Sequence, residues 1–368
     1  MSRVAALSLG MLAYTYAGYP LLVGALGRIA GREHRRDRSY QPKVSVLIPA
    51  FNAERYVAPK LESLLAQEYP ADKLEILVYS DASTDGTDAA IRAFSDRGVE
   101  LVRGEERKGK PTALNVLRPR ATGEILVLTD IRQPLSKNAV ADLVSHFWDD
   151  EVGCVSGNLV LEGGTGAGFY WAYENFIRQS EARFRGMVGV TGPLYAIRAR
   201  DLGAVPTDII LDDMWIPMQL ALRGKKLVLD ERAIALDEAF EDDREKGRKV
   251  RTLAGNFQLF ERLPALLSPL SNPMWFETTS HKLLRLAGPA LLAGAVGGAA
   301  YGAFFGKSLV ERTSMKALLG AEVAFALLAL AGPRAGAPGK LARTFVVLNT
   351  AAFEGFMKHV GEGQRVTW

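Results

Sequence analysis

The sequence is poor in the residues that build disulfides and soft metal sites. Its 368 residues include one cysteine, Cys154, and four histidines. A single cysteine excludes a disulfide within the chain, and no cysteine cluster is present to bind a metal. The histidines are not at metal-ligand spacing from one another, so no histidine zinc site is predicted. The net charge of +4 is also too small to predict a nucleic-acid partner.

Two common nucleotide-binding motifs are absent as well. No G-x-G-x-x-G follows the first predicted strand, and G-x-x-x-x-G-K-[ST] occurs nowhere in the chain. Dinucleotide-dependent dehydrogenases and P-loop proteins therefore lose their main support. The hydrophobic residues make up 48% of the chain and the charged residues 23%, a balance that excludes a disordered or fibrous protein.

Long apolar runs lie at the two ends of the chain. Residues 4–26 carry no charge and are long enough for a membrane-spanning anchor, with a cleaved signal peptide as the alternative. Five arginines follow this run and predict that the chain after it lies on the cytoplasmic side of the membrane: Arg28, Arg32, Arg35, Arg36 and Arg38. We therefore expect a multi-pass protein of the inner (cytoplasmic) membrane, with its central region in the cytoplasm and membrane lipids as partners.

Two further spans are predicted near the C-terminus, at residues 283–306 and 317–332, separated by a polar loop at 307–316. The run 345–357 is too short to predict another span, so the topology of residues 345–368 stays open. Within the first of these spans, small residues recur at every fourth position: Gly294, Gly298, Gly302 and Gly306. This spacing lets two membrane helices approach closely, and it permits an oligomer formed through that face.

The centre of the chain has the pattern of an α/β domain. Short apolar strands are predicted at 44–48, 75–79, 99–103 and 124–129, the first closed by Pro49, with helices between them. Continuously apolar strands that alternate with helices predict a mostly parallel sheet. We expect an N-terminal anchor and basic segment (1–41), this cytoplasmic domain (42–254), interfacial amphipathic helices (255–282) and a C-terminal membrane region (283–368). Packing of the 255–282 stretch onto the domain is the alternative.

Six motifs of the central domain, in the expected order, resemble those of the family-2 nucleotide-sugar glycosyltransferases. They are Val46-Leu-Ile-Pro-Ala-Phe-Asn52, Ser80-Asp-Ala-Ser-Thr-Asp-Gly-Thr87, Lys108-Gly-Lys-Pro-Thr-Ala-Leu-Asn115, Gly123-Glu-Ile-Leu-Val-Leu-Thr-Asp130, Val190-Thr-Gly-Pro-Leu-Tyr-Ala-Ile-Arg198 and Leu211-Asp-Asp213. With membrane helices on both sides, the chain is similar to the branch of cellulose, hyaluronan and chitin synthases. The resemblance implies the Rossmann-like GT-A fold.

The resemblance also implies a donor site. Pro49, Ala50, Asn52 and Asp81 would hold the nucleotide, and Lys108 and Lys110 would approach its diphosphate. Asp213 matches the general base of an inverting transfer, Asp212 would orient it, and Gly192 would line the donor and acceptor pocket. Arg248 and Arg251 lie where processive relatives carry a diphosphate-binding motif, but Thr252 replaces its tryptophan, which argues against processive synthesis.

The metal-binding D-x-D motif of the family is altered, because Asp130 is retained and its second carboxylate is replaced by Arg132. Two interpretations follow. Mg²⁺ or Mn²⁺ could still bind through Asp130 and the donor diphosphate, which we favour. Alternatively, Arg132 itself would neutralise the leaving diphosphate.

The sequence thus predicts a membrane-bound inverting glycosyltransferase of polysaccharide or glycolipid synthesis. It would use a nucleotide-diphosphate donor, for which we expect a UDP-sugar, and a saccharide or lipid-linked acceptor. The alternative is a non-catalytic nucleotide-sugar-binding subunit or sensor of a polysaccharide-export complex, for which Arg132 is the main support and against which Asp213 argues.

Overall fold

The computed structural model describes residues 2–31, 34–162, 168–238 and 242–361. The chain forms two compact units. The helical unit comprises Met1–Ala25, Asp242–Gln258 and Phe276–Gly363, and the sheet unit contains Leu26–Glu241 and Leu259–Trp275. The boundaries that we predict for four regions stay a prediction.

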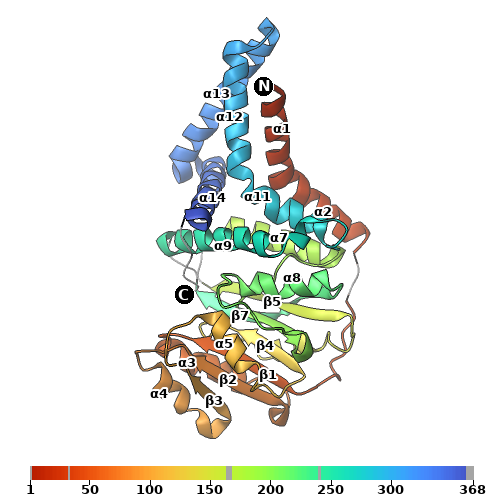
Figure 1. Ribbon diagram of the computed structural model, residues 1–368, viewed down its shortest axis with the longest axis vertical. Helices are drawn as coiled ribbons and strands as arrows, with labels where there is room; N and C mark the ends of the chain where they lie inside the picture. Colours follow the sequence, from red (N-terminus) through yellow and green to blue (C-terminus); the bar gives the residue numbers. More distant parts are fainter. Residues whose placement is uncertain (1, 32–33, 163–167, 239–241, 362–368) are drawn as a thin grey trace. The chain divides into compact units, whose positions relative to one another are not determined.

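A seven-stranded sheet organises the sheet unit, in the order β3-β2-β1-β4-β6-β5-β7 (Figure 1). Its strands are β1 (Val44–Ala50), β2 (Leu74–Ser80), β3 (Val99–Arg103), β4 (Ile125–Thr129), β5 (Val152–Glu162), β6 (Leu194–Arg198) and β7 (Lys226–Glu238). Every neighbouring pair is parallel except those that involve β6, which runs antiparallel to β4 and β5. The expected mostly parallel α/β sheet is confirmed.

Helices connect these strands, as the alternating pattern predicts. They are α3 (Glu54–Leu65), α4 (Thr87–Arg92), α5 (Lys110–Leu117), α6 (Ala139–Val144), α7 (Gly168–Phe184) and α8 (Asp212–Leu222). Short 3₁₀ turns lie at Ala71–Lys73, Ser95–Arg97, Ala199–Asp201 and Pro264–Leu267. Leu266 in the last turn is fully buried and Met274 is nearly so, within the sheet unit.

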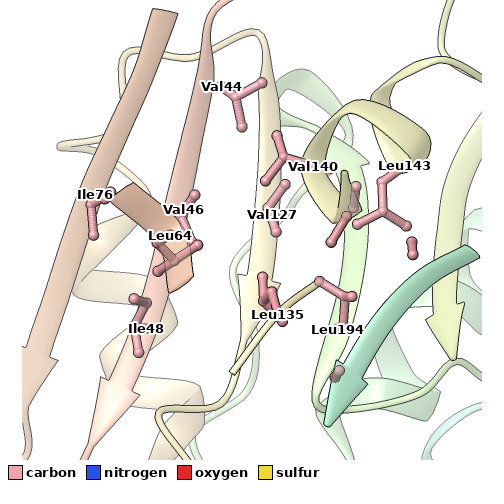
Figure 2. Close-up of a cluster of buried hydrophobic side chains, with 14 of the residues drawn as sticks. Val44, Val46, Ile48, Leu64, Ile76, Val127, Leu135, Val140, Leu143 and Leu194 are labelled. Atoms are coloured by element: carbon pink, nitrogen blue, oxygen red, sulfur yellow. The ribbon is translucent and has the colours of Figure 1, made fainter. Parts of the chain in front are cut away.

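The core of the sheet unit is continuous from α3 through the strands to α6. All seven residues of β1 are buried, as are all five of β4, because helices cover this part of the sheet on both faces. Val46 and Ile48 of β1 lie beside Leu64 of α3, and Val127 of β4 faces Val140 of α6 (Figure 2). This packing gives the strand ends of β1 and β4 a rigid support.

The first strand is longer than its sequence indicates. Pro49 does not close β1, which continues to Ala50 opposite Ser80 of β2. The pairing of β1 with β4 stops earlier, at Leu47. Pro49 therefore lies where β1 has only β2 as a partner, so its missing N–H costs the sheet little.

The helical unit begins with one continuous helical run, α1 (Ser2–Ala13), a π-helical turn (Tyr14–Gly18) and the start of α2 (Tyr19–Ile29). The other helices lie wholly or mostly in this unit, except that the end of α9 after Gln258 and Trp275 of α10 belong to the sheet unit. They are α9 (Asp242–Arg262), α10 (Trp275–Glu277), a π-helical turn (Thr278–Leu283), α11 (Leu284–Leu286), α12 (Gly288–Phe305), α13 (Leu309–Ala331) and α14 (Gly336–Gly361), with a 3₁₀ turn at Gly332–Ala335. Among the described residues, three helical stretches are long and apolar enough to cross a membrane: 2–29, 288–305 and 309–361.

One prediction at the C-terminal end was wrong. Most of the expected polar loop at 307–316 is helix, because Ser308 caps α13: its side-chain oxygen accepts a hydrogen bond from the Glu311 backbone N–H at 3.1 Å. The Glu311 carboxylate in turn accepts from the Lys307 backbone N–H at 2.9 Å. Such reciprocal caps satisfy backbone donors that a helix start leaves open. The run 345–357, whose topology the sequence leaves open, is part of a longer helix, α14, of 26 residues.

The glycine face of α12 is used within the chain. A Cβ at Gly294 would lie 2.6 Å from the Ser8 hydroxyl of α1, and one at Gly302 would lie 2.6 Å from Cγ of Met315 in α13. Gly298 is buried between them. The close approach that the spacing predicts is therefore intramolecular, with two helices of the same chain as its partners.

Candidate active site

The ends of three parallel strands meet at one edge of the sheet. β1 pairs with β2 on one side and with β4 on the other, so the residues that follow these strands are neighbours. Asp81 follows β2 and Asp130 follows β4. Open α/β sheets bind ligands at the carboxyl ends of their strands, and this edge is the candidate site.

Asp81 organises the loop that leads into α5. Its side chain is fully buried, and its two oxygens accept hydrogen bonds from the backbone N–H groups of Lys108 and Gly109, each at 2.8 Å. The Asp81 backbone N–H donates to the Ala50 oxygen at 2.8 Å, which ties β2 to the end of β1. Asp81 thus positions the loop of the predicted diphosphate lysines, and its contact with a nucleotide stays a prediction.

The turns after β1 and β2 contain the two residues other than glycine that adopt positive φ in the described chain, Asn52 at 44° and Ala82 at 55°. The Asn52 side-chain oxygen accepts from the Thr84 backbone N–H at 2.8 Å, and its own N–H donates to the Ser83 hydroxyl at 3.1 Å. These bonds join the two turns. Asparagine adopts this conformation at little cost, whereas alanine is strained in it. The contact of Asn52 with a nucleotide stays a prediction.

Lys110 joins the strand end to the helix that carries the predicted base. Its ammonium lies 2.9 Å from Asp130 Oδ1 and 3.2 Å from Asp212 Oδ2. The Lys110 side chain is 13% exposed, whereas that of Asp130 is 37% exposed and open to a ligand. The fold therefore brings together a cation and carboxylates that lie far apart in the sequence.

The charge state of Lys110 is fixed by these neighbours. Burial alone would lower its pKa, but the carboxylates of Asp130, Asp212 and Asp213 outweigh burial and hold the pKa of Lys110 above its usual value. Lys110 is consequently a cation at physiological pH. The single positive charge of Lys110 thus attracts three carboxylates at this edge of the sheet.

Asp212 and Asp213 form the first turn of α8, where the helix dipole favours acids. The Tyr195 hydroxyl donates to Asp212 Oδ2 at 3.2 Å, and burial together with Asp212 raises the pKa of Tyr195 well above its usual value. A Cβ at Gly192 would lie only 2.8 Å from Asp213 Oδ2. The Val190 backbone N–H also donates to the Asp213 backbone oxygen, at 3.0 Å. The segment before β6 thus lies against the predicted base.

Arg132 forms an ion pair with Asp237 of β7, whose side chain is 4% exposed. The Gln133 side-chain amide donates to the same Asp237 oxygen at 2.9 Å. The residue that replaces the second D-x-D carboxylate is therefore engaged with a buried acid. This pairing opposes the interpretation that Arg132 neutralises the leaving diphosphate.

The side chains near Asp130 supply only some of the ligands that a divalent metal ion needs. Within the described residues, no group of three or more histidine, cysteine, aspartate or glutamate side chains could hold a metal. Asp130 supplies one half-exposed carboxylate, and a hard cation there would need phosphate oxygens and water as its other ligands. The protein thus offers an incomplete metal site that a donor diphosphate could complete.

Three predicted site residues lie away from this cluster or in the other unit. Lys108 is exposed and pairs with Glu106 at 3.2 Å. Arg248 and Arg251 lie on α9, within the segment Asp242–Gln258 that belongs to the helical unit. Their diphosphate-binding role stays a prediction.

The sequence alone missed two basic residues of this region. Arg178 of α7 donates to the hydroxyls of Thr191 at 2.5 Å and Ser156 at 3.3 Å. Burial lowers the pKa of Arg178, an effect that nearby carboxylates, among them that of Asp213, oppose. The second is Lys60, which is fully buried beneath Asp130. The sequence signal that could have revealed Lys60 is its position on the otherwise apolar face of the predicted helix.

Comparison with known proteins shows what the sheet unit is similar to. Residues 45–202 match the family model described as glycosyl transferase family 2. The solved structure of the mannosyltransferase PcManGT from Pyrobaculum calidifontis, in complex with GDP-Man and Mn²⁺, is 26% identical. Its superposition has a TM-score of 0.78 and covers 98% of this chain and all of that one. The fold is therefore GT-A-like, and residues 45–202 of the sheet unit are similar to the glycosyl transferase family 2 domain.

Curated relatives match over shorter segments. The probable glycosyltransferase YdaM of Bacillus subtilis is 35% identical over 131 residues, which are 34% of this chain and 31% of YdaM. The glycosyltransferase AglE of Haloferax volcanii is 29% identical over 176 residues, 46% of this chain and 58% of AglE. The matches thus span from about a third to under two thirds of these relatives.

Proposed function

We propose that the protein is a membrane-bound inverting glycosyltransferase that uses a nucleotide-diphosphate sugar. The observation that carries this proposal is the position of Lys110 between Asp130, at the end of β4, and Asp212, beside the predicted base. A cation between a donor-side carboxylate and a base-side carboxylate is suited to a reaction that releases a diphosphate. The family 2 domain and its GT-A-like fold support the same activity.

In the proposed reaction Asp213 acts as general base. An acceptor hydroxyl gives its proton to an Asp213 oxygen as the hydroxyl oxygen bonds to C1 of the donor sugar. The bond between C1 and the diphosphate oxygen breaks, its electrons leave with the nucleoside diphosphate, and the anomeric centre inverts. Asp212 and Tyr195 hold the first turn of α8, which fixes the position of Asp213. Lys110 offsets the negative charge at the donor edge.

A divalent ion, Mg²⁺ or Mn²⁺, belongs to this proposal. Asp130 would hold it together with the donor diphosphate, and the ion would neutralise charge on the leaving group. PcManGT, which was solved with GDP-Man and Mn²⁺, supports this assignment. Lys110 and the ion would then share the Asp130 carboxylate.

We propose that the acceptor lies at a membrane, because the helical unit contains helices that could span one. Three candidate spanning stretches support membrane attachment, and the arginines after residue 26 support a cytoplasmic sheet unit. One relative, 29% identical over 118 residues, is named UDP-Glc:alpha-D-GlcNAc-diphosphoundecaprenol beta-1,3-glucosyltransferase WfgD, from Escherichia coli. A saccharide or lipid-linked acceptor is consistent with that name.

Nucleotide release tests the function directly. Detergent-purified protein with membrane lipids is incubated with UDP-, GDP- and dTDP-sugars, in Mg²⁺, Mn²⁺ or chelator, beside the D213N variant. We expect release with one donor, loss of release in D213N, and loss in chelator. Saturable donor binding without release in the presence of lipid and saccharide acceptors would instead favour the alternative, a non-catalytic binding subunit, for which the engaged Arg132 is the supporting observation.

A further inference from the structure

Lys60 is a fully buried lysine on a helix face that is otherwise apolar. It lies on α3, and its neighbours on the inward face are Val57, Leu61 and Leu64, which are also fully buried. Lysine is almost never found fully buried, because burial disfavours its charged form. Its retention in this core therefore calls for partners that only a long polar side chain reaches.

Those partners flank Asp130 in the sequence. Nζ of Lys60 donates to the Thr129 hydroxyl at 2.6 Å and to the Gln133 backbone oxygen at 2.6 Å. Thr129 is the last residue of β4, and Gln133 lies at the far end of the turn that carries Asp130 and Arg132. One buried group thus holds both ends of this turn.

The connection continues toward the predicted base. The Thr129 hydroxyl donates its single proton to the Pro193 backbone oxygen at 2.6 Å, so it accepts from Lys60 and cannot donate to it. The Asp130 backbone N–H reaches the same Pro193 oxygen, at 3.4 Å. Pro193 follows Gly192, the residue in close contact with the Asp213 carboxylate.

We propose that Lys60 is a positioning residue of the transfer site. It holds the Thr129–Gln133 turn, and with it Asp130, and through Thr129 it keeps the Gly192–Pro193 segment beside Asp213. This inference rests on the proposed function, and it adds a residue that does not contact substrate. Its effect is transmitted entirely through backbone and hydroxyl groups of the two segments.

The test compares two substitutions in and next to the same helix. K60M keeps the length of the side chain and removes both hydrogen bonds beneath Asp130. Q67M is the matched control, because the buried Gln67 amide binds the Ser63 and Ser136 oxygens at 2.9 and 2.8 Å and accepts from the Val140 N–H. Gln67 therefore ties the end of α3 to the chain beyond the turn and leaves the turn itself untouched.

Binding of UDP and GDP with Mn²⁺ is measured by calorimetry on the full chain in detergent, beside nucleotide release and thermal unfolding. We expect K60M to weaken nucleotide binding at least tenfold and to lower kcat/KM by about 10–100-fold, since a small displacement of a reacting group has effects of this size. Q67M should change nucleotide affinity and kcat/KM less than twofold, although its melting temperature should be comparable to that of K60M.

A T129V variant tests the route of the effect. If Lys60 acts through Thr129, the double variant K60M/T129V should lose no more binding than K60M alone. If K60M does not fold, T129V decides in its place, because it removes one hydroxyl at nearly constant volume.

The outcomes separate this inference from the function on which it rests. If neither nucleotide binds the unaltered protein, the proposed function is wrong and the inference falls with it. If a nucleotide binds and K60M binds it as Q67M does, the function stands and the role of Lys60 is overturned. A T129V variant that binds and releases nucleotide normally would overturn the part of this role that runs through Thr129 to the Gly192–Pro193 segment.

Discussion

The ammonium of Lys110 lies 2.9 Å from the carboxylate of Asp130, at the end of a strand, and it also contacts Asp212, at the start of a helix. The residues come from three motifs that are separated by up to about a hundred positions. This ion pair defines the centre of the candidate site, because it relates the donor-side residue to the base-side pair.

Removal of this cation should destabilise the protein. In K110M the nearly buried carboxylate of Asp212, 9% exposed, loses its cation. The carboxylate of Asp130 loses the same cation, but it is partly exposed to solvent. Breaking a buried pair costs about 3–5 kcal/mol, and we expect about 2–4 kcal/mol here because Asp130 is partly exposed. Chemical unfolding measures the difference. K108M is the control, since Lys108 and its partner are exposed and its loss should stay within about 0.5 kcal/mol.

Replacement of the predicted base should separate binding from chemistry. D213N keeps the shape of the side chain and removes its ability to accept a proton, so transfer should fall by about 10²–10⁴-fold. Donor binding should change little, because the proposed partner of Asp213 is the acceptor hydroxyl and not the donor sugar. The exposed Asp96, changed to asparagine, provides the control, and transfer by D213N at the rate of that control would contradict the assignment.

The buried Lys60 predicts a rise of stability with pH. Burial lowers the pKa of Lys60 to about 7, an effect that Asp130 opposes, from about 10.5 in the unfolded chain. Between these values the unfolded chain holds a proton that the folded protein has released, so stability increases by up to about 1.4 kcal/mol per pH unit. The stability difference between the unaltered protein and K60M should therefore grow in favour of the unaltered protein from pH 7 to pH 9. A difference that stays constant across this range would show that the lysine does not titrate there.

Restoring the D-x-D motif by R132D should be harmful on its own. It would place a carboxylate beside the buried Asp237, which now accepts from both Arg132 and Gln133. We expect a lower melting temperature in R132D and recovery in the double variant R132D/D237N, where an amide replaces the opposing charge. Binding of Mn²⁺, followed by its paramagnetic signal, should be tighter in the double variant. An R132D protein as stable as the unaltered one would contradict the pairing.

The glycine face of α12 allows a paired test of helix packing. A Cβ at Gly294 would lie 2.6 Å from the Ser8 hydroxyl, whereas one at Gly297 would meet nothing within 4 Å. G294V should destabilise the helical unit by about 1–3 kcal/mol, the usual cost of overpacking, and G297V should be nearly neutral. Thermal unfolding in detergent compares the two. Equal melting temperatures would mean that α1 does not pack on this face.

Much of the fold follows from local pattern. The first four strands and the connecting helices were predictable because apolar β-branched runs and helical spacing are local signals. The antiparallel β6 and the long β5 and β7 were not predicted, because their pairing depends on residues far away in the chain. The start of α13 was missed although Ser308 and Glu311 form a readable capping pair.

Six short motifs in order were enough to predict the class of domain and the residues of its candidate site. How those residues pair could be learned only from the fold. Lys110 contacts Asp130 and Asp212, Arg132 pairs with Asp237, and Lys60 lies beneath Asp130. The pKa of a charged group and its partners depend on groups within a few ångströms, and folding brings those groups together from distant positions in the chain.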